Sequence, residues 1–212
     1  SLGKFTLKSG INDLEAVIPY PGKAKQWSIN DPNLYHVVLL AEKSGDIVAM
    51  RQERTGFRTM KVKGTGFEFN NKPIYLLGES AHSSSHGGTP NYDAQSIMRY
   101  LLTKHKENGI MLLRTAHMPM IREFYEVADE IGMMVYDEWG MCFVNSIDEK
   151  VFEKNNLAEL EKLIIRDYNH PSVVLWSLGN ENKHGGHPEI AAQMDKQYEL
   201  LKKIDRQNRP TS

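Results

Sequence analysis

The sequence has a single cysteine, no long apolar run and no excess of charge of either sign. Cys142 has no second cysteine to pair with, so we expect a small buried apolar group, and its presence indicates nothing about the redox compartment. No stretch of about 18 apolar residues occurs, so no membrane-spanning helix is expected. The 26 basic and 27 acidic residues nearly cancel. This balance argues against nucleic acid or an anionic membrane as a partner, because both select a basic face.

The composition is typical of a globular protein, with 25% charged and 40% hydrophobic residues. A length of 212 residues is enough for one domain or for parts of two. The first residues, Ser1–Phe5, contain neither an initiator Met nor the charged and apolar regions of a signal peptide. We therefore expect the sequence to begin inside a longer protein.

The first 60 or so residues carry the pattern of β-strands. Residues 34–40 are rich in β-branched and aromatic side chains, residues 43–46 form a turn sequence, and a second strand begins at Ile47. Residues 57–62 alternate between apolar and polar side chains. A complete β-sandwich needs about seven strands and 100 residues, so four or five strands predict part of one. A short hairpin over residues 67–77 follows.

After residue 74 the pattern changes to strands alternating with helices. Apolar runs at 110–113, 133–136 and 173–176 each follow an amphipathic helical pattern, and a last helix begins near Pro188. Apolar strands without alternation are typical of parallel sheets, which are buried on both faces. Four such strands with their helices predict an α/β fold, either a TIM barrel or a doubly wound sheet. No G-x-G-x-x-G sequence follows a strand, which argues against dinucleotide binding.

Polar, chemically reactive side chains follow each predicted strand of this second part. In TIM barrels the catalytic residues lie at the C-terminal ends of the strands, so this placement favours the barrel. Carboxylates supply acid and base chemistry, and a tryptophan offers a stacking face to a sugar ring. The pattern therefore predicts a carbohydrate site. The residues are Glu79 and His82 after the first strand, Arg114 and His117 after the second, Asp137, Glu138 and Trp139 after the third, and Asn180 and Glu181 after the fourth.

One continuous segment is specific enough to indicate a family. Residues 166–181 read Arg-Asp-Tyr-Asn-His-Pro-Ser-Val-Val-Leu-Trp-Ser-Leu-Gly-Asn-Glu and resemble the acid/base signature of glycoside hydrolase family 2. Further motifs occur in the family's order, at residues 27–35, 56–58, 71–74, 114–117 and 137–138. The resemblance spans residues 27–210. It implies that residues 1–62 are part of an immunoglobulin-like β-sandwich and that residues 63–212 are the first half of a TIM-barrel catalytic domain, about four strand–helix units.

The resemblance also implies an activity, that of a retaining β-glycosidase. In this mechanism two carboxylates flank the glycosidic bond. The motif places Glu181 as the acid/base and Asn180 against the sugar 2-hydroxyl. The acid must hold a proton before it reacts, so partly apolar surroundings are expected around Glu181. The family's nucleophile is a glutamate at the end of a seventh strand, outside these residues, so we expect the isolated chain to be inactive.

The remaining rim residues are assigned with open alternatives. Arg114 either orients a catalytic carboxylate or pairs with Asp137 or Glu138. His82 and His117 are either site residues or strand caps. Trp139 is either a sugar platform or rim packing, whereas Asp137, Asp167, His170 and Trp176 are expected to be structural. The predicted substrate-binding set is Asn180, His82, Arg114, His117, Glu138 and Trp139.

Departures from the family pattern limit the prediction. Ser80 and Ala81 replace the Asn and Arg that family members usually carry before His82. Cys142 and Val144 occupy the positions of the magnesium ligands of metal-using β-galactosidases, so we expect no catalytic metal and no other cofactor. The form Ser-Leu-Gly-Asn-Glu, ending at Glu181, is the one common in β-galactosidases. The alternatives are a β-glucuronidase or β-mannosidase, or a non-catalytic carbohydrate-binding relic, and the full-length enzyme could be a homo-oligomer.

Overall fold

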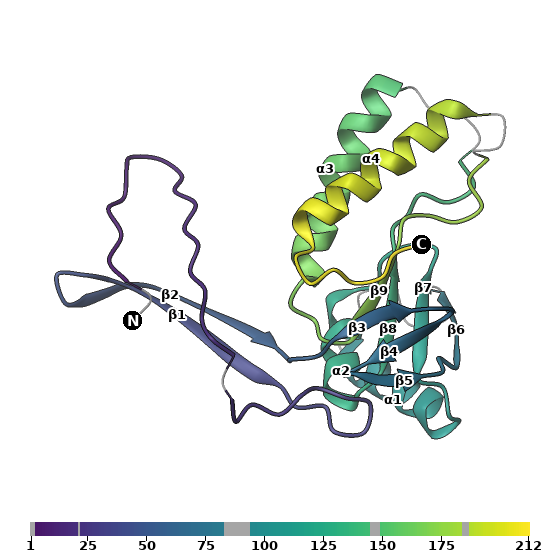
Figure 1. Cartoon of the computed structure of the whole chain (residues 1–212), viewed down its shortest axis with the longest axis horizontal. Coiled ribbons are helices and arrows are strands. Elements are labelled where there is room, and N and C mark those ends of the chain that lie inside the picture. Colours follow the sequence, from purple (N-terminus) through teal and green to yellow (C-terminus); the bar gives the residue numbers. More distant parts are fainter. Residues whose placement is uncertain (1–2, 21, 83–93, 145–148, 184–186) are drawn as a thin grey trace.

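A long hairpin and a small sheet form the first part of the molecule. The computed structural model describes residues 3–20, 22–82, 94–144, 149–183 and 187–212. The antiparallel hairpin of β1 (Tyr35–Lys43) and β2 (Asp46–Thr55) projects from the body of the protein (Figure 1). The strands β3 (Met60–Lys63), β4 (Gly66–Phe69) and β5 (Lys72–Ile74) then form a separate antiparallel sheet.

The second part alternates strictly between strands and helices. Its four strands are parallel and pair in the order of the sequence, as expected for one half of a TIM barrel. Residues 210–212 run beside the last strand, where Trp176 N donates to Pro210 O and Ser212 N donates to Trp176 O, both at 3.0 Å. The elements are β6 (Gly78–His82), α1 (Ala94–Glu107), β7 (Leu112–Ala116), α2 (Arg122–Ile131), β8 (Met134–Glu138), α3 (Glu149–Asp167), β9 (Val173–Ser177) and α4 (Pro188–Ile204).

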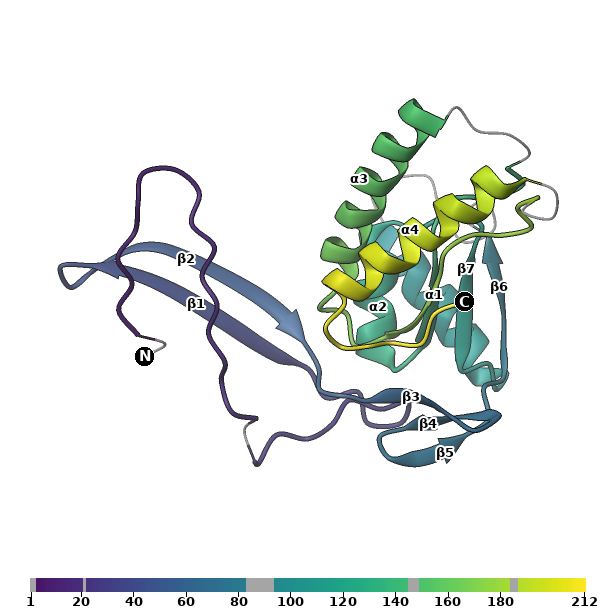
Figure 2. The same ribbon diagram turned by 45° about the horizontal axis from the view of Figure 1, so that its top comes forward.

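The parallel sheet is buried on both faces, and each face has its own apolar cluster. On one face Leu113 and Val135 pack with helix residues such as Phe124. On the other face Met134 packs with Trp27, and the small β3–β4–β5 sheet closes this cluster. Figure 2 shows that sheet below the N-terminal ends of the parallel strands. Because side chains alternate along a strand, neighbouring residues of β8 belong to different faces.

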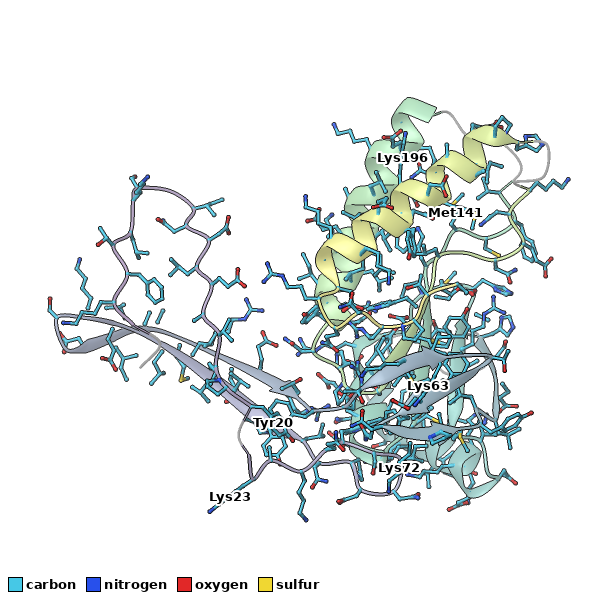
Figure 3. All side chains as sticks on the ribbon, viewed as in Figure 1. Tyr20, Lys23, Lys63, Lys72, Met141 and Lys196 are labelled. Atoms are coloured by element: carbon cyan, nitrogen blue, oxygen red, sulfur yellow. The ribbon has the colours of Figure 1, made fainter. Side chains whose placement is uncertain are left out.

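Specific contacts fix where the helices meet the sheet. Helix α2 ends at Gly132, whose backbone is left-handed (φ 76°) and whose N–H donates to Ala128 O at 3.1 Å. A Cβ at Gly132 would collide with Ile29 O, so only glycine fits this close approach. Between α3 and α4, Lys196 and Glu153 pair at 2.6 Å (Figure 3).

A group of buried charges lies at the N-terminal ends of the strands. Asp129 accepts hydrogen bonds from Ser172 N at 3.0 Å and from His170 Nδ1 at 2.6 Å. Arg166 holds Asp167 with two hydrogen bonds of 2.8 and 2.6 Å. Asp129 thereby joins α2 to the start of β9, while Arg166 and Asp167 pair within the last turn of α3, in line with the structural role predicted for His170 and Asp167.

The cation Arg209 fills a similar role beside β9. Its guanidinium holds Asp205, which also accepts a hydrogen bond from Trp176 Nε1 at 3.0 Å. Trp176 is 2% exposed and belongs to the core, as predicted. Nearby, burial and then the charge of Arg209 lower the pKa of Arg58 to about 9, so this guanidinium is still protonated at neutral pH.

Two expectations about strand positions were wrong. The first parallel strand is β6, so Glu79 and His82, which were expected on the rim after that strand, lie within it. Before β3 the described residues contain two full strands, β1 and β2, rather than three or four. The expected domain boundary after residue 62 falls within β3. Within the described ranges, none of the helices has the length and hydrophobicity of a transmembrane segment.

Candidate active site at the ends of the parallel strands

Four of the predicted site residues meet at one edge of the parallel sheet. Arg114 lies in β7, His117 directly follows that strand, Glu138 ends β8, and Asn180 follows β9. Parallel strands end at the same edge, so side chains far apart in the sequence come into direct contact. Arg114 and His117 both contact Glu138, and Arg114 also donates to Asn180.

Glu138 is completely buried, and its carboxylate is fully used. Its Oε2 accepts hydrogen bonds from Arg114 Nε and from Ser177 Oγ, both at 2.7 Å, and Arg114 Nη2 lies 2.5 Å from the same oxygen in an ion pair. Its Oε1 contacts His117 Nδ1 at 2.8 Å, and its backbone N–H donates to Thr115 Oγ1. Both oxygens of the carboxylate are therefore engaged by neighbouring side chains, Oε2 by Arg114 and Ser177 and Oε1 by His117. Glu138 is therefore a fixed anion inside the wall of the site.

Arg114 connects this anion to Asn180. Its Nη2 donates to Asn180 Oδ1 at 2.7 Å and is also ion-paired with Glu138. An arginine has only donors, so the side-chain oxygen of Asn180 must be the atom that faces it. The amide nitrogen of Asn180 then points the other way, where its recorded contact is a long one of 3.8 Å to Cys142 Sγ.

The loops after β8 and β9 are joined side by side by hydrogen bonds. Asn180 N donates to Met141 O at 2.9 Å, and Phe143 N donates to Asn180 O at 3.0 Å. The side chain of Asn182 adds two bonds, from Val144 N at 3.0 Å and to Met141 O at 2.9 Å. The candidate residues therefore sit on a paired, bonded segment rather than on a free loop.

Gly179 is required where these two loops touch. A Cβ at this position would lie 2.5 Å from Asn182 Nδ2 and 2.6 Å from Met141 O. Both distances are far below ordinary van der Waals separation, which is about 3.5 Å. The absence of a side chain at Gly179 thus lets the two loops pair.

Glu181 projects from this paired segment. It has a left-handed backbone (φ 47°), which is uncommon for a residue with a side chain and is often found at functional sites. Asn180 before it and Asn182 after it are both bonded to the neighbouring loop, so the surrounding structure maintains this conformation. The side chain is exposed in the described structure, so the partly apolar surroundings expected for the acid are not present around it.

Asp137 lies behind the site on the helix-facing side of β8. Its Oδ1 accepts hydrogen bonds from Tyr125 Oη at 2.7 Å and from Thr115 Oγ1 at 3.2 Å. Burial, and then the nearby carboxylate of Asp167, raise the pKa of Asp137 well above its ordinary value. Because Thr115 also accepts from Glu138 N, Asp137 supports the site from beneath, in line with the structural role predicted for it.

The two predicted histidines lie next to each other. The rings of His82 and His117 are in edge-to-face contact, with centroids 5.3 Å apart. His117 also contacts Phe143, with centroids 5.7 Å apart. A carboxylate only accepts hydrogen bonds, so His117 Nδ1, which contacts Glu138 Oε1, carries a proton. Cys142 is half-exposed rather than buried as expected.

Trp139 and Glu79 are positioned differently from the prediction. The indole N–H of Trp139 donates to Asn156 Oδ1 of α3 at 2.7 Å, and its ring packs on the helix-side cluster. Glu138 faces the barrel interior, so the next side chain must face the helices. Trp139 therefore packs on the rim against α3, and Glu79 pairs with His105 of α1. Glu138, predicted to contact substrate, lies behind Arg114 instead.

Two residues of the candidate site, Ser177 and Phe143, were not predicted from the sequence. Ser177 is the register partner of Glu138 in the β8–β9 pairing, so its position beside that carboxylate follows from aligning the two strand ends. Phe143 lies in a loop, and no periodic signal places it.

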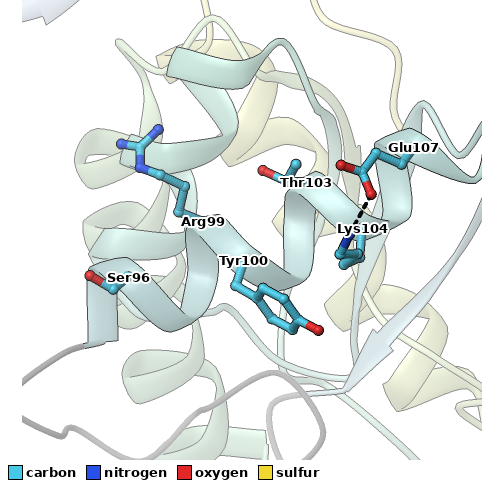
Figure 4. Close-up of a pocket in the computed structure, with 6 residues that line it drawn as sticks. All are labelled: Ser96, Arg99, Tyr100, Thr103, Lys104 and Glu107. Carbon is cyan, nitrogen blue, oxygen red and sulfur yellow. Dashed lines mark hydrogen bonds and ion pairs between the residues drawn. The ribbon is translucent and has the colours of Figure 1, made fainter.

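An open hollow elsewhere, lined by Arg99, Tyr100 and Lys104 of α1, lies on a helix surface away from this site (Figure 4).

Comparison with known proteins agrees with this geometry. Residues 60–211 match the family model described as glycosyl hydrolases family 2, TIM barrel domain. The chain belongs to glycoside hydrolase family 2. Among the described residues of this family member, no three His, Cys, Asp or Glu side chains gather in a group that could bind a metal ion.

Relatives with named activities are of two kinds. A protein of Formosa agariphila, named provisionally as a beta-glucuronidase, is 33% identical over 74% of this chain and 19% of its own length. A beta-galactosidase of Photobacterium profundum is 30% identical over 82% of this chain and 18% of its own length. The crystal structure of Ruminococcus gnavus beta-glucuronidase aligns with a TM-score of 0.78 at 27% identity, covering 89% of this chain and 33% of that one. The chain thus spans about a fifth of these curated relatives.

Proposed function

We propose that the protein containing this chain is a retaining glycoside hydrolase that removes terminal β-linked sugars, with Glu181 as the acid/base. The observation that carries this proposal is the placement of an exposed Glu181 at the end of β9, directly after the anchored Asn180. In this position a carboxylic acid can reach a substrate that lies over the strand ends.

The proposed mechanism divides the work among the rim residues. Glu181 protonates the leaving oxygen and, in the second step, removes a proton from the attacking water. Asn180 donates from its amide nitrogen to the sugar 2-hydroxyl, a contact that strengthens in the transition state. Nε2 of His117 forms a hydrogen bond with another substrate hydroxyl. Arg114 supplies no free charge, because Glu138 neutralises it.

The nucleophile of this mechanism lies outside the 212 residues. Glu138 is unsuitable because it is completely buried and both of its carboxylate oxygens are engaged. Glu79 is unsuitable because its carboxylate is turned to His105 of α1. The family resemblance implies a glutamate at the end of a seventh strand as the second carboxylate, so we expect the chain on its own to have no glycosidase activity.

We propose a β-galactoside as the substrate and a β-glucuronide as the alternative. The named relatives include both activities, and the segment ending at Glu181 has the form common in β-galactosidases. The test is an assay of the enzyme expressed from its complete reading frame on nitrophenyl β-galactoside, β-glucuronide and β-mannoside. Activity on one of them identifies the sugar.

The role of Glu181 is tested with Glu181→Gln beside a matched control, Glu159→Gln. Glu159 is an exposed residue of α3 that pairs with Lys162. We expect the first variant to lose about 100- to 10,000-fold in kcat/KM on substrates with poor leaving groups, and less with nitrophenolate, which needs little protonation. The control should match wild type. An unchanged Glu181→Gln rate, or a wild type inert on every sugar, would contradict the proposal and favour a carbohydrate-binding relic.

A further inference from the structure

We infer that Glu138 is a positioning residue that holds Arg114 and, through it, sets which face of the Asn180 amide meets the substrate. The kinetic meaning of this inference rests on the proposed glycosidase function. Its structural content concerns only these three side chains and can be tested separately.

The first step is that Glu138 cannot act by touching a sugar. Its side chain has no exposed surface, and it is engaged by two nitrogens of Arg114, by His117 and by Ser177. These donors come from β7, from the residues just after it, and from β9. One carboxylate at the end of β8 therefore joins the ends of three neighbouring strands.

The second step is that this carboxylate fixes the guanidinium of Arg114. Two nitrogens of Arg114 bind the same oxygen of Glu138, at 2.7 and 2.5 Å, which defines both the position and the plane of the group. The Arg114 side chain is 29% exposed, so without the anion it would have solvent into which to move. Glu138 keeps it against Asn180.

The third step concerns the polarity of the chain of hydrogen bonds. Glu138 only accepts and Arg114 only donates, so Asn180 must present its oxygen to Arg114 and turn its nitrogen away from it, toward Cys142 Sγ at 3.8 Å. An asparagine amide released from Arg114 can turn over, which exchanges donor and acceptor. A buried acid thus ensures that the site offers a donor to the sugar 2-hydroxyl.

The kinetic test compares Glu138→Gln with wild type on a β-glycoside and on the same glycoside lacking the 2-hydroxyl. A glutamine places a donor among the donors of Arg114, His117 and Ser177 and so breaks the hold. We expect kcat/KM on the 2-hydroxyl substrate to fall about 3- to 10-fold, the worth of one hydrogen bond between uncharged groups, with a much smaller fall on the 2-deoxy substrate. Asn180→Ala should reduce the same ratio, and the double variant should reduce it no further.

Equal losses on both substrates would show that Glu138 is a general structural carboxylate and would overturn the inference. Ser177→Ala is the milder second variant, because it removes one donor and leaves the carboxylate in place. We expect it to lower the same ratio by a smaller factor. The surface variant Glu159→Gln should leave the ratio unchanged.

A crystal structure of Glu138→Gln tests the structural content without any activity. We expect Arg114 to be displaced and the Asn180 amide to be turned. An unchanged contact between Arg114 and Asn180 would overturn the inference. A wild-type enzyme inert on all sugars would contradict the proposed function alone, and the crystal structure would still decide this inference.

Discussion

Replacing Gly179 by alanine should separate the two loops that carry the site. The added Cβ would lie 2.5 Å from Asn182 Nδ2 and 2.6 Å from Met141 O, whereas about 3.5 Å is ordinary separation. One of these loops must therefore move by about 1 Å. Asn182 can rotate away, but only by giving up its bonds across the gap, and Met141 O is backbone.

The expected cost has a structural and a kinetic part. Overpacking of this kind lowers the free energy of unfolding by about 1–3 kcal/mol. A 1 Å shift of Asn180 and Glu181 should lower the rate about 100-fold, mostly in kcat, because their contacts strengthen in the transition state. The measurement is kcat and KM of the complete enzyme, together with its urea midpoint.

The matched control is Gly140→Ala on the same rim. A Cβ at Gly140 would meet its nearest atoms at 3.8 Å, which is an ordinary contact. This variant should behave like wild type. If Gly179→Ala were as active and as stable as Gly140→Ala, the close pairing of the two loops would not be what positions the acid, and the reasoning would be refuted.

Two further variants test the surroundings of the site. Because burial and Asp167 raise the pKa of Asp137, the folded protein binds a proton that the unfolded chain has released, so stability falls as pH rises from the ordinary aspartate range up through the raised pKa. Asp137→Asn should remove this pH-dependent loss, so that its stability relative to wild type increases as pH rises. The measurement is the urea midpoint of both proteins at low and at high pH, with the exposed Asp195→Asn variant as control. The same difference between Asp137→Asn and wild type at both pH values would contradict this. Trp139→Phe should lose about 1 kcal/mol of stability with its hydrogen bond to α3 and leave KM unchanged, whereas a large rise in KM would show that the indole binds sugar after all.

The strand–helix order and the site's location could be read from the sequence because both depend on local signals. Apolar runs gave the strands β7, β8 and β9 within a few residues, and parallel pairing then required their polar ends to meet. The segment ending at Glu181 indicates the family, and through it predicts the acid/base, because the whole motif lies on one strand and its loop. These are the parts of the site that a continuous stretch of chain encodes.

Side-chain direction was harder to predict because it depends on strand register. Successive side chains of a strand point to opposite faces, so a shift of one residue in register exchanges the two faces. For this reason Glu138 faces the site, whereas the next residue, Trp139, faces α3. The start of β6 was misplaced for a similar reason, since Gly78–His82 contain no apolar run. The contact between Glu79 of β6 and His105 of α1 could not be predicted, because no local sequence pattern indicates which side chains of a strand and a helix will meet.

The proposed role of Glu181 is that of the acid/base in a retaining enzyme. The most direct test is the Glu181→Ala variant of the complete enzyme, assayed on a nitrophenyl β-glycoside with added sodium azide. Azide should replace water in the second step, restore turnover and give a β-glycosyl azide, because it attacks the glycosyl-enzyme from the face that Glu181 served. An α-glycosyl azide would make Glu181 the nucleophile, and no rescue from a variant that has lost activity would remove it from the chemistry.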